Sequence, residues 1–563
     1  MPKVCPVTGR TFSVSAAEMA LRKKLGIEGE PEFHPVFRFQ LLGAFWQHWN
    51  LFKRKCDKTG KSIISVFSED CPYPVWHKDE WIKHSDPPGA DFDPSRPVFD
   101  QMWDFFRRSP IAHNVGAGND NCEYTDDWWY CKNCYLSHSG YQCEDLRYTY
   151  RVIRMRNSQF CVFSFDSELC VDLINSHNCF RSAYLYNCWN CSDSAFLYDC
   201  RNCSHCLFCS NLRNKSYCFG NQQLTKEEYE KRAKEWDFRS RKIYEAAKKS
   251  FMRMLLEQSW HRALFLDRCE NVTGNYLDEC KNCENCFFLT TGAEDAINVL
   301  RGGDANRDLL DCVSPYGHTE LVYYSSIPQD HCYAISCCAD LVQCKYMEYS
   351  AHCFQCQHCF GCCGLVGKKY HIFNKPYEPE EYERRKAEII AAMKRTPYQT
   401  PGGVGTGQVE YGRFFPGYFA ANPYEESLSG FYWPLSKDEG QRLGFRMRER
   451  EEERAVESLD ASEVPDRCDE AGDDLAEKVF WDKVAKRPFQ IAAADITFAQ
   501  NLGVPLPFIY YMHRIQDNFR LIPFDGELRS VSCGKCRKET KTSWTREYDG
   551  RILCEECYLA EVY

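Results

Sequence analysis

Cysteines in the first half of the chain follow a strict three-residue spacing. All fourteen cysteines from Cys122 to Cys218 differ in position by multiples of three, and many successive members lie nine residues apart. No helical period of 3.6 residues accompanies this pattern. The spacing therefore predicts a repeat protein in which equivalent side chains stack from one coil to the next.

The nine-residue step predicts short strands joined by tight corners. A strand of four or five residues and one corner take up about nine residues, so two or three such units would complete one coil of a β-solenoid. Asparagine tolerates the left-handed backbone conformation that a tight corner requires. We therefore expect corners at the asparagines that precede cysteines, such as Asn121, Asn133, Asn178, Asn187 and Asn202.

The middle of the sequence is duplicated. HCLFCSNLRNKSYCFGNQQLTKEEYEKR (205–232) recurs as HCFGCCGLVGKKYHIFNKPYEPEEYERR (358–385), at a shift of 153 residues. This duplication predicts two solenoid blocks, 115–223 and 262–376, each followed by a helix, 224–260 and 377–395. Thr225 with Glu228 predicts a capping box at the start of the first helix, and Pro379 suits the first turn of the second.

The two ends of the chain are also related. RTFSVSAAEMALRKKLGI (10–27) aligns with RPFQIAAADITFAQNLGV (487–504) at a shift of 477, which slips by one residue near Pro31 and returns at Cys56. The chain is therefore expected to be a mainly β repeat protein, with treble-clef or zinc-ribbon modules at 1–90 and 479–563 flanking the two cysteine-ladder solenoid blocks. Residues 396–478 combine glycine-rich, aromatic and acidic stretches, which predict an extended linker.

The C-terminal module carries the clearest metal pattern. Cys533-x2-Cys536 and Cys554-x2-Cys557 are two cysteine pairs separated by seventeen residues. This spacing is typical of a tetrahedral zinc–thiolate site, in which two tight turns each supply two ligands. Four protein ligands leave no position for water or substrate, so we predict one structural Zn²⁺.

The N-terminal copy has lost part of this set. At the shift of 477, the four cysteines of the C-terminal module fall on Cys56, Thr59, His77 and Glu80. A second incomplete set consists of Cys5, Thr8 and His34. Because threonine cannot replace a thiolate ligand, we expect this module to fold without tightly bound metal, although a site with fewer ligands is an open alternative.

Two rows of four cysteines allow more than one interpretation. Cys200, Cys203, Cys206 and Cys209 are spaced by three residues, and so are Cys353, Cys356, Cys359 and Cys362. Comparable runs in ferredoxins place the fourth cysteine after three residues and are followed by proline, which is not the pattern here. Repetition along the chain favours packing of small apolar side chains in a core. A zinc or iron–sulfur site and redox-active thiols remain alternatives.

Composition narrows the function class. The chain has 36 cysteines among 563 residues, no apolar leader and no long apolar run, which predicts a cytoplasmic protein with reduced thiols and no membrane span. Its net charge of −10 gives no general attraction to nucleic acid. No catalytic motif is recognisable, so we expect a non-catalytic zinc-binding scaffold.

The macromolecular partner of this scaffold is expected to be a protein rather than a nucleic acid. One alternative is a metal or redox protein that uses the cysteine rows. A second alternative is a nucleic-acid-associated zinc-finger protein, based on the basic stretch KRAKEWDFRSRKIYEAAKKSFMR, residues 231–253.

Two resemblances add to this interpretation. CGKCRKETKTSWTREYDGRILCEECYL (533–559) resembles the GATA-type treble-clef finger, which implies a zinc-held hairpin followed by a short helix. GATA fingers bind DNA partly through a basic tail after the last cysteine, whereas here the chain ends in LAEVY. The stretches KRKCDKTGKSIIS, YGRFFPGYF and YWPLSKDEG, together with the cysteine repeat, resemble a group of uncharacterised cysteine-rich proteins from candidate-phyla bacteria. That group usually has C-x2-C pairs where this chain has Thr8 and Thr59.

Overall fold

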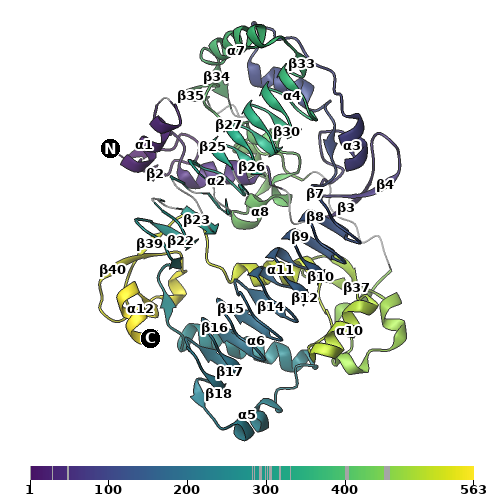
Figure 1. The fold of residues 1–563 in the computed structure, drawn as a ribbon, viewed down its shortest axis with the longest axis vertical. Coiled ribbons are helices and arrows are strands. Elements are labelled where there is room, and N and C mark those ends of the chain that lie inside the picture. Colours follow the sequence, from purple (N-terminus) through teal and green to yellow (C-terminus); the bar gives the residue numbers. More distant parts are fainter. Residues whose placement is uncertain are drawn as a thin grey trace. The chain divides into compact units, whose positions relative to one another are not determined.

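The chain folds into two compact units, each built from separate stretches of the sequence. The computed structural model describes residues 2–563 except 28, 47–49, 282, 284–285, 291–294, 298, 301, 304–306, 316, 318, 330, 400–404 and 449–456. Unit 1 consists of residues 1–114, 264–450 and 524–529, and unit 2 of residues 115–263, 451–523 and 530–563. Unit 1 therefore contains the N-terminal module and the second solenoid block, and unit 2 contains most of the C-terminal module and the first solenoid block (Figure 1).

The first solenoid block, in unit 2, has twelve residues per coil. Its strands pair in parallel with partners twelve positions away, as Ala183 pairs with Ala195 and Leu185 with Leu197. Figure 1 shows β14 to β17 as successive rungs. The strands are β7 (Gly116–Ala117), β8 (Glu123–Trp129), β9 (Tyr135–Tyr141), β10 (Glu144–Arg147), β11 (Tyr150–Ile153), β12 (Arg156–Gln159), β13 (Val162–Phe165), β14 (Val171–Ile174), β15 (Ala183–Tyr186), β16 (Ala195–Tyr198), β17 (Ser204–Ser210), β18 (Ser216–Phe219) and the antiparallel β19 (Gln222–Gln223).

Each coil has four sides of three residues. Every third residue adopts a left-handed conformation, for example Asn178, Arg181, Tyr184 and Asn187 with φ of 53°, 44°, 57° and 54°. The corner asparagines predicted from the sequence all have positive φ, so that prediction is confirmed. The prediction that two or three nine-residue units make a coil is wrong. Nine residues span only three of the four sides.

The residue that follows each corner faces the interior of the coil. These positions mostly hold cysteine, serine and leucine. The apolar ones form one continuous buried cluster, which also includes Trp128 and Met155. Cys200, Cys203, Cys206 and Cys209 are therefore the four inward residues of a single coil, and their side chains are 0–1% exposed. A narrow bore filled by small side chains explains why cysteine recurs on the three-residue lattice.

The second solenoid block, in unit 1, follows the same plan, but the length of its coils varies. Leu266 pairs with Leu277, eleven positions away. Glu320 pairs with Tyr333, thirteen positions away, and Tyr333 pairs with Lys345, twelve positions away. Together the two blocks have about 20 turns. The strands are β21 (Leu266–Asp267), β22 (Gly274–Asp278), β23 (Cys286–Thr290), β24 (Gly302–Gly303), β25 (Glu320–Tyr323), β26 (Ser326–Gln329), β27 (Tyr333–Ser336), β28 (Ala339–Val342), β29 (Lys345–Glu348), β30 (Ala351–Phe354), β31 (Gln357–Phe360), β32 (Lys369–Ile372) and β33 (Lys375–Pro376).

Helical segments follow both blocks. Thr225 and Glu228 form the predicted capping box at the start of α5 (Lys226–Ala233). The single helix expected over 224–260 is wrong, because a turn separates α5 from α6 (Arg241–Glu257). In that turn Trp236 and Phe238 pack against rings of the solenoid, and Ser240 caps α6. After the second block, α7 (Pro379–Met393) begins with the predicted proline.

The two ends of the chain share one order of elements. At the N-terminus these are β1 (Lys3–Val4), β2 (Thr11–Phe12), α1 (Ala16–Lys24), α2 (Pro35–Gly43), β3 (Phe52–Lys55), β4 (Ser62–Ser65) and α3 (Lys78–His84). At the C-terminus they are β37 (Val479–Asp482), β38 (Arg487–Gln490), α10 (Ala493–Leu502), α11 (Tyr511–Arg520), β39 (Arg529–Ser532), β40 (Glu539–Thr542) and α12 (Glu555–Val562). α1, β3 and α3 correspond to α10, β39 and α12 at the shift of 477 residues found in the sequence.

The segment expected to be an extended linker, 396–478, is largely folded. Phe415 and Phe419 are buried and contact rings of α4 (Val98–Phe106), and the buried Phe414 contacts Phe45. These contacts lie within unit 1, so the aromatic stretch forms core rather than linker. Residues 400–404 and 449–456 lie outside the described part. The remaining elements are β5 (Val75–Trp76), β6 (Ile111–Ala112), β20 (His261–Arg262), β34 (Pro397–Gln399), β35 (Gly405–Val409), η1 (Gly417–Phe419), η2 (Tyr424–Glu426), α8 (Leu428–Tyr432), α9 (Lys437–Arg442), β36 (Leu459–Asp460), η3 (Ala461–Glu463), η4 (Cys468–Glu470), η5 (Asp473–Glu477), η6 (Arg546–Tyr548) and β41 (Ile552–Leu553).

Candidate metal centre

The first cysteine pair lies in the turn between β39 and β40. The N–H of Cys533 donates to the carbonyl of Lys538 (2.9 Å), and the N–H of Arg537 donates to the carbonyl of Cys533 (3.1 Å). The tight turn places Arg537 at φ 64°, in the left-handed region. Gly534 lies so close to Gly550 that an added Cβ would be 2.2 Å from its carbonyl oxygen. This packing holds Cys533 and Cys536 on one side of the turn.

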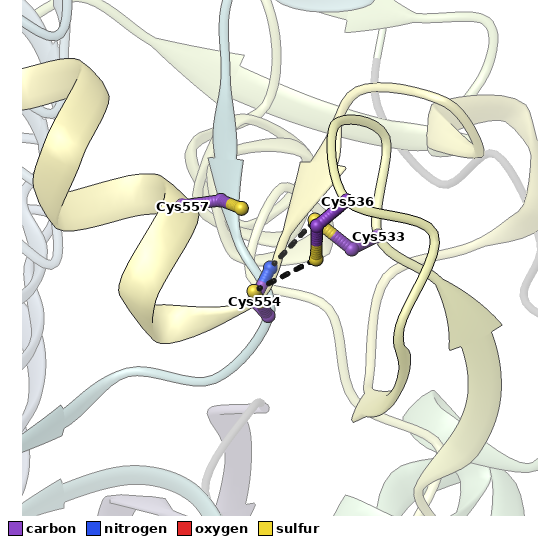
Figure 2. A group of neighbouring side chains, drawn as sticks. All are labelled: Cys533, Cys536, Cys554 and Cys557. Carbon is purple, nitrogen blue, oxygen red and sulfur yellow. Dashed lines mark hydrogen bonds between the residues drawn. The ribbon is translucent and has the colours of Figure 1, made fainter.

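The second pair lies at the start of α12. Cys554 occupies the N-cap position, and its N–H donates to the sulfur of Cys533 (3.4 Å). The N–H of Tyr558 donates to the carbonyl of Cys554 (2.9 Å), which closes the first turn of the helix. Cys557 is therefore carried by that first turn, on the same side as Cys554 (Figure 2).

The structure brings all four predicted ligands together. Their sulfur atoms lie within 4.8 Å of one another, and the sulfurs of Cys536 and Cys554 are 3.7 Å apart. Tetrahedral zinc with Zn–S bonds of about 2.3 Å requires sulfur–sulfur distances of about 3.8 Å. Figure 2 shows the side chains converging from the turn and from the helix. This group can therefore hold a metal ion. Within the described part of the chain, no second group of three or more His, Cys, Asp or Glu ligands is gathered in this way.

The pKa values of Cys533 and Cys557 are shifted in opposite directions. Burial raises the pKa of Cys533, but backbone N–H groups of Cys554, Cys536 and Lys535 that point at its sulfur outweigh this and bring the pKa to about 6. The hydrogen bond with Cys536 is the main cause that raises the pKa of Cys557 to about 12. The four thiols therefore do not all ionise at neutral pH by themselves, and a bound divalent cation would stabilise the remaining thiolates.

A strand from elsewhere in unit 2 completes this module. β20 pairs in parallel with β41, with His261 opposite Ile552 and Arg262 opposite Leu553. Trp544 is buried against His261 and donates its indole N–H to the carbonyl of Arg262 (3.0 Å). The guanidinium of Arg262 also forms two hydrogen bonds with Glu555, of 2.7 and 2.8 Å. This strand could not be predicted from the sequence, because a strand of two residues has no periodicity to detect.

The module lies against the side of the first solenoid block. Trp544 contacts the rings of Tyr186 and Tyr198, which stand one above the other on successive coils. The hydroxyl of Tyr558 bonds Asp199 and also accepts from Nη2 of Arg213 (2.8 Å). The contacts of this module therefore spread along the coils of the first block.

The N-terminal counterpart keeps the backbone of the site but only the first of its four cysteines, Cys56. The N–H of Cys56 donates to the carbonyl of Lys61 (2.9 Å), as Cys533 does to Lys538, and Gly60 takes the left-handed position with φ 69°. The N–H of His77 donates to the sulfur of Cys56 (3.3 Å), in the way that Cys554 donates to Cys533. The same turn and the same helix start are therefore built twice.

The other side chains of this N-terminal set are engaged elsewhere. Thr59 hydrogen-bonds the thiol of Cys56. The imidazole of His77 stacks on His113 and accepts the N–H of Asp79 (3.3 Å), which caps α3. The carboxylate of Glu80 lies 3.4 Å from Nζ of Lys58. The structure thus brings Cys56 and Thr59 together but does not direct the other two side chains toward them.

The set of Cys5, Thr8 and His34 does not converge. The hydroxyl of Thr8 accepts the N–H of Arg10 (3.4 Å) within its own turn. His34 accepts the N–H of Val36 at Nδ1 (3.2 Å), and its Nε2 lies 3.1 Å from Glu527. Cys5 is buried in the module. Its turn nevertheless repeats the knuckle, because the N–H of Cys5 donates to the carbonyl of Arg10 (2.9 Å).

The cysteine rows of the solenoids already have backbone acceptors. The thiol of Cys206 lies 3.3 Å from the carbonyl of Ser204 and 3.8 Å from that of Lys215, and the other thiols of the row follow the same rule. Burial raises the pKa of Cys200 and of Cys353. Hydrogen bonds, first with Cys191, lower the pKa of Cys203. Each thiol thus has a place in the packing without a metal ion.

No family profile and no curated protein matches the chain. Among the described residues, no helix combines the length and the apolar character needed to cross a bilayer. The four-cysteine group is therefore the feature from which a function can be argued.

Proposed function

We propose that the protein is a non-catalytic, zinc-containing scaffold whose C-terminal module depends on one structural Zn²⁺. The observation that supports this most directly is the convergence of Cys533, Cys536, Cys554 and Cys557, with all four sulfurs within 4.8 Å of one another. Four thiolates fill a tetrahedral coordination sphere, so the ion would have no open position for water or substrate. Its role would be to stabilise the fold.

The arrangement around the cysteines supports a treble-clef module. A hairpin of β39 and β40 carries the first pair, and the N-terminus of α12 carries the second. In sites of this type zinc substitutes for a hydrophobic core that so short a segment cannot build. We infer a reducing, cytoplasmic setting from the 36 cysteines, because the described cysteines are free thiols in the structure.

The solenoid would supply the binding surface of the scaffold. Its outer ladders carry amides and charges of both signs, for example Asn190 bonded to Asn202 (3.0 Å) and Arg154 paired with Asp166 (2.6 Å). A surface of mixed charge on a chain with net charge −10 favours a protein partner over a nucleic acid, which would require a continuous basic track.

The metal content of purified protein tests the zinc proposal. We expect about one zinc per chain in the wild type, lost when Cys554 and Cys557 are both replaced by serine. The matched control is the double variant His77→Ser and Glu80→Ser in the N-terminal module, which should keep the zinc of the C-terminal module. Absence of zinc from protein refolded with zinc would contradict the proposal.

Binding to nucleic acid is tested separately. Fluorescence anisotropy with labelled single-stranded and double-stranded DNA and RNA at physiological salt should show no association. Salt-sensitive binding that tightens as salt falls would support the zinc-finger alternative and overturn the choice of a protein partner.

A further inference from the structure

Unit 1 contains a cavity that the metal site does not explain. It has a volume of about 250 Å³ and lies between the N-terminal module and the second solenoid block, within unit 1. Its wall combines hydroxyl and ionisable side chains with aromatic and aliphatic ones. Those that bear on its chemistry are Phe12, Ser13, Glu18, His34, Phe287 and Ile297.

A buried carboxylate provides one wall of the cavity. Glu18 is 6% exposed, and its Oε1 accepts a hydrogen bond from Nη1 of Arg38 (2.7 Å). The same Nη1 also donates to Asp311 (2.8 Å), so two buried carboxylates share one guanidinium. Arg38 bonds one oxygen of Glu18, and the second oxygen can accept from a ligand. A second buried arginine, Arg22, also acts electrostatically on Asp311, so these two carboxylates face two cations. The acceptor that remains open here is the second oxygen of Glu18.

The opposite wall is held by a histidine and a second glutamate. His34 is 4% exposed, and because its Nδ1 accepts the N–H of Val36, its Nε2 carries the proton and donates to Glu527 (3.1 Å). This hydrogen bond is the main cause that lowers the pKa of Glu527, and Arg10 pairs with the same carboxylate. Glu527 is therefore already paired with Arg10 and His34, so the carboxylate that can still accept a ligand is Glu18.

The duplicated module in unit 2 shows what fills the equivalent place. Glu18 corresponds to Asp495 at the shift of 477, and Asp495 is 0% exposed. Its carboxylate accepts from Nε of Arg147 (2.6 Å) and from the hydroxyl of Tyr148 (2.7 Å), both of which come from the solenoid. In unit 2 a guanidinium from the solenoid thus neutralises the carboxylate of the module.

One position on the solenoid can be compared between the units. In unit 2 this position is Gln159, which pairs with Val171 on the next coil. The residue after Val171 is Asp172, the aspartate that binds Arg514. The side-chain amide of Gln159 donates to Asp495 (3.3 Å). In unit 1 the carbonyl of Ile297 accepts the N–H of Asp311, the aspartate that binds Arg38. An aliphatic side chain therefore stands where unit 2 has a hydrogen-bonding amide, and it lines the cavity.

We propose that this cavity binds a small organic cation, with a guanidinium or ammonium group that pairs with Glu18 next to the rings of Phe12 and Phe287. A carboxylate in a partly closed, aromatic-lined cavity attracts a cation through charge and through the faces of the rings. The ligand would take the place that the guanidinium of Arg147 occupies in unit 2. This proposal is independent of zinc and stands or falls separately from the proposed function.

Calorimetric titration of the full-length protein with agmatine and with putrescine tests the proposal. We expect at least one of these cations to bind with a dissociation constant below about 1 mM, which corresponds to about 4 kcal/mol. Glu18→Gln should weaken this binding by about tenfold or more. Absence of heat for both cations up to about 10 mM, well above that dissociation constant, would overturn the proposal.

A second variant keeps the test valid if Glu18→Gln fails to fold. Ser13 is exposed at the rim of the cavity, so Ser13→Trp should close it without touching the carboxylate and should abolish binding. Gln490 occupies the equivalent exposed position in unit 2, and Gln490→Trp should leave binding unchanged. Equal binding by wild type and Ser13→Trp, or loss in Gln490→Trp alone, would contradict the assignment of this cavity.

Discussion

The two end modules of the chain build the same turn on different chemistry. Around Cys56 and around Cys533 the first cysteine N–H bonds a carbonyl five residues on, at 2.9 Å in both, and its sulfur accepts an N–H from the start of the following helix. In the C-terminal module three more sulfurs join the first. In the N-terminal module a threonine hydroxyl and a helix-capping histidine occupy these places.

The same turn and helix start therefore occur once with four cysteines and once with a single cysteine. The same backbone hydrogen bonds form the turn in both modules, with side-chain hydrogen bonds beside it in the N-terminal one and, in our proposal, a zinc ion in the C-terminal one. Both versions bury aromatic side chains at matching positions, Phe67 and Trp81 in the N-terminal one and Trp544 and Tyr558 in the C-terminal one. The four converging sulfurs are therefore the main difference between them. The C-terminal module should therefore depend on its metal far more than the N-terminal module depends on any ligand.

Replacing Cys536 with serine should produce the largest effect. We expect the loss of about one zinc equivalent and local unfolding of residues 530–563, because thiolate ligation is the main folding contribution in a module of this size. Metal analysis and hydrogen exchange measure the two effects. The matched substitution Thr59→Ser should leave both unchanged. Unaltered zinc content in Cys536→Ser would break the comparison.

Removal of zinc from the wild type should affect the two modules unequally. After treatment with a chelator we expect faster hydrogen exchange in β39, β40 and α12, and unchanged exchange in β3, β4 and α3. Mass spectrometry of peptides from each segment resolves the two. Equal loosening of both modules would mean that the N-terminal one also relies on a metal ion.

The missing ligands can be restored in the N-terminal module. The triple variant Thr59→Cys, His77→Cys and Glu80→Cys recreates the four-cysteine set on a backbone that already has the turn and the helix start. We expect zinc content to rise from about one to about two equivalents, since each closed set of four thiolates holds one ion. A variant that is well folded but still holds one zinc would show that the two backbones differ more than their hydrogen bonds indicate.

The smallest effect is expected in the cysteine row of the first solenoid. Cys206→Ala should lower the free energy of unfolding by about 1–2 kcal/mol, as for a modest truncation in a packed core, and leave zinc unchanged. Cys359→Ala, at the same place in the second block, should behave alike. Denaturant unfolding and metal analysis check this result. A fall in metal content with either variant would instead assign a metal site to the rows.

The group of four converging cysteines could be predicted because its geometry is local. Each C-x2-C pair lies within one turn or one helix start, and the distance between the pairs is bridged by a single hairpin. Thr59, His77 and Glu80 stand where the N-terminal module lacks a cysteine. These positions could be located because the duplicated modules keep their order of elements. Strand β20 could not be predicted, since nothing in its sequence indicates pairing with a strand almost three hundred residues away.

The period of the coil was missed for a physical reason. Any of the four sides can carry a cysteine toward the interior, so cysteine spacing reports the three-residue side and not the coil. A signal for the coil is present in Asn178, Asn190, Asn202 and Asn214, which are twelve residues apart and stack on the outside. The pairing of each end module with the more distant block could not be predicted, because it depends on long-range packing.

The central claim is that four cysteine thiolates of the C-terminal module hold one zinc ion. X-ray absorption at the zinc edge on the purified full-length protein tests this claim most directly, combined with metal quantification. We predict about one zinc per chain, surrounded by four sulfur atoms at about 2.3 Å, with no nitrogen or oxygen ligand. A zinc environment that contains nitrogen or oxygen, or a folded protein that takes up no zinc, would contradict it.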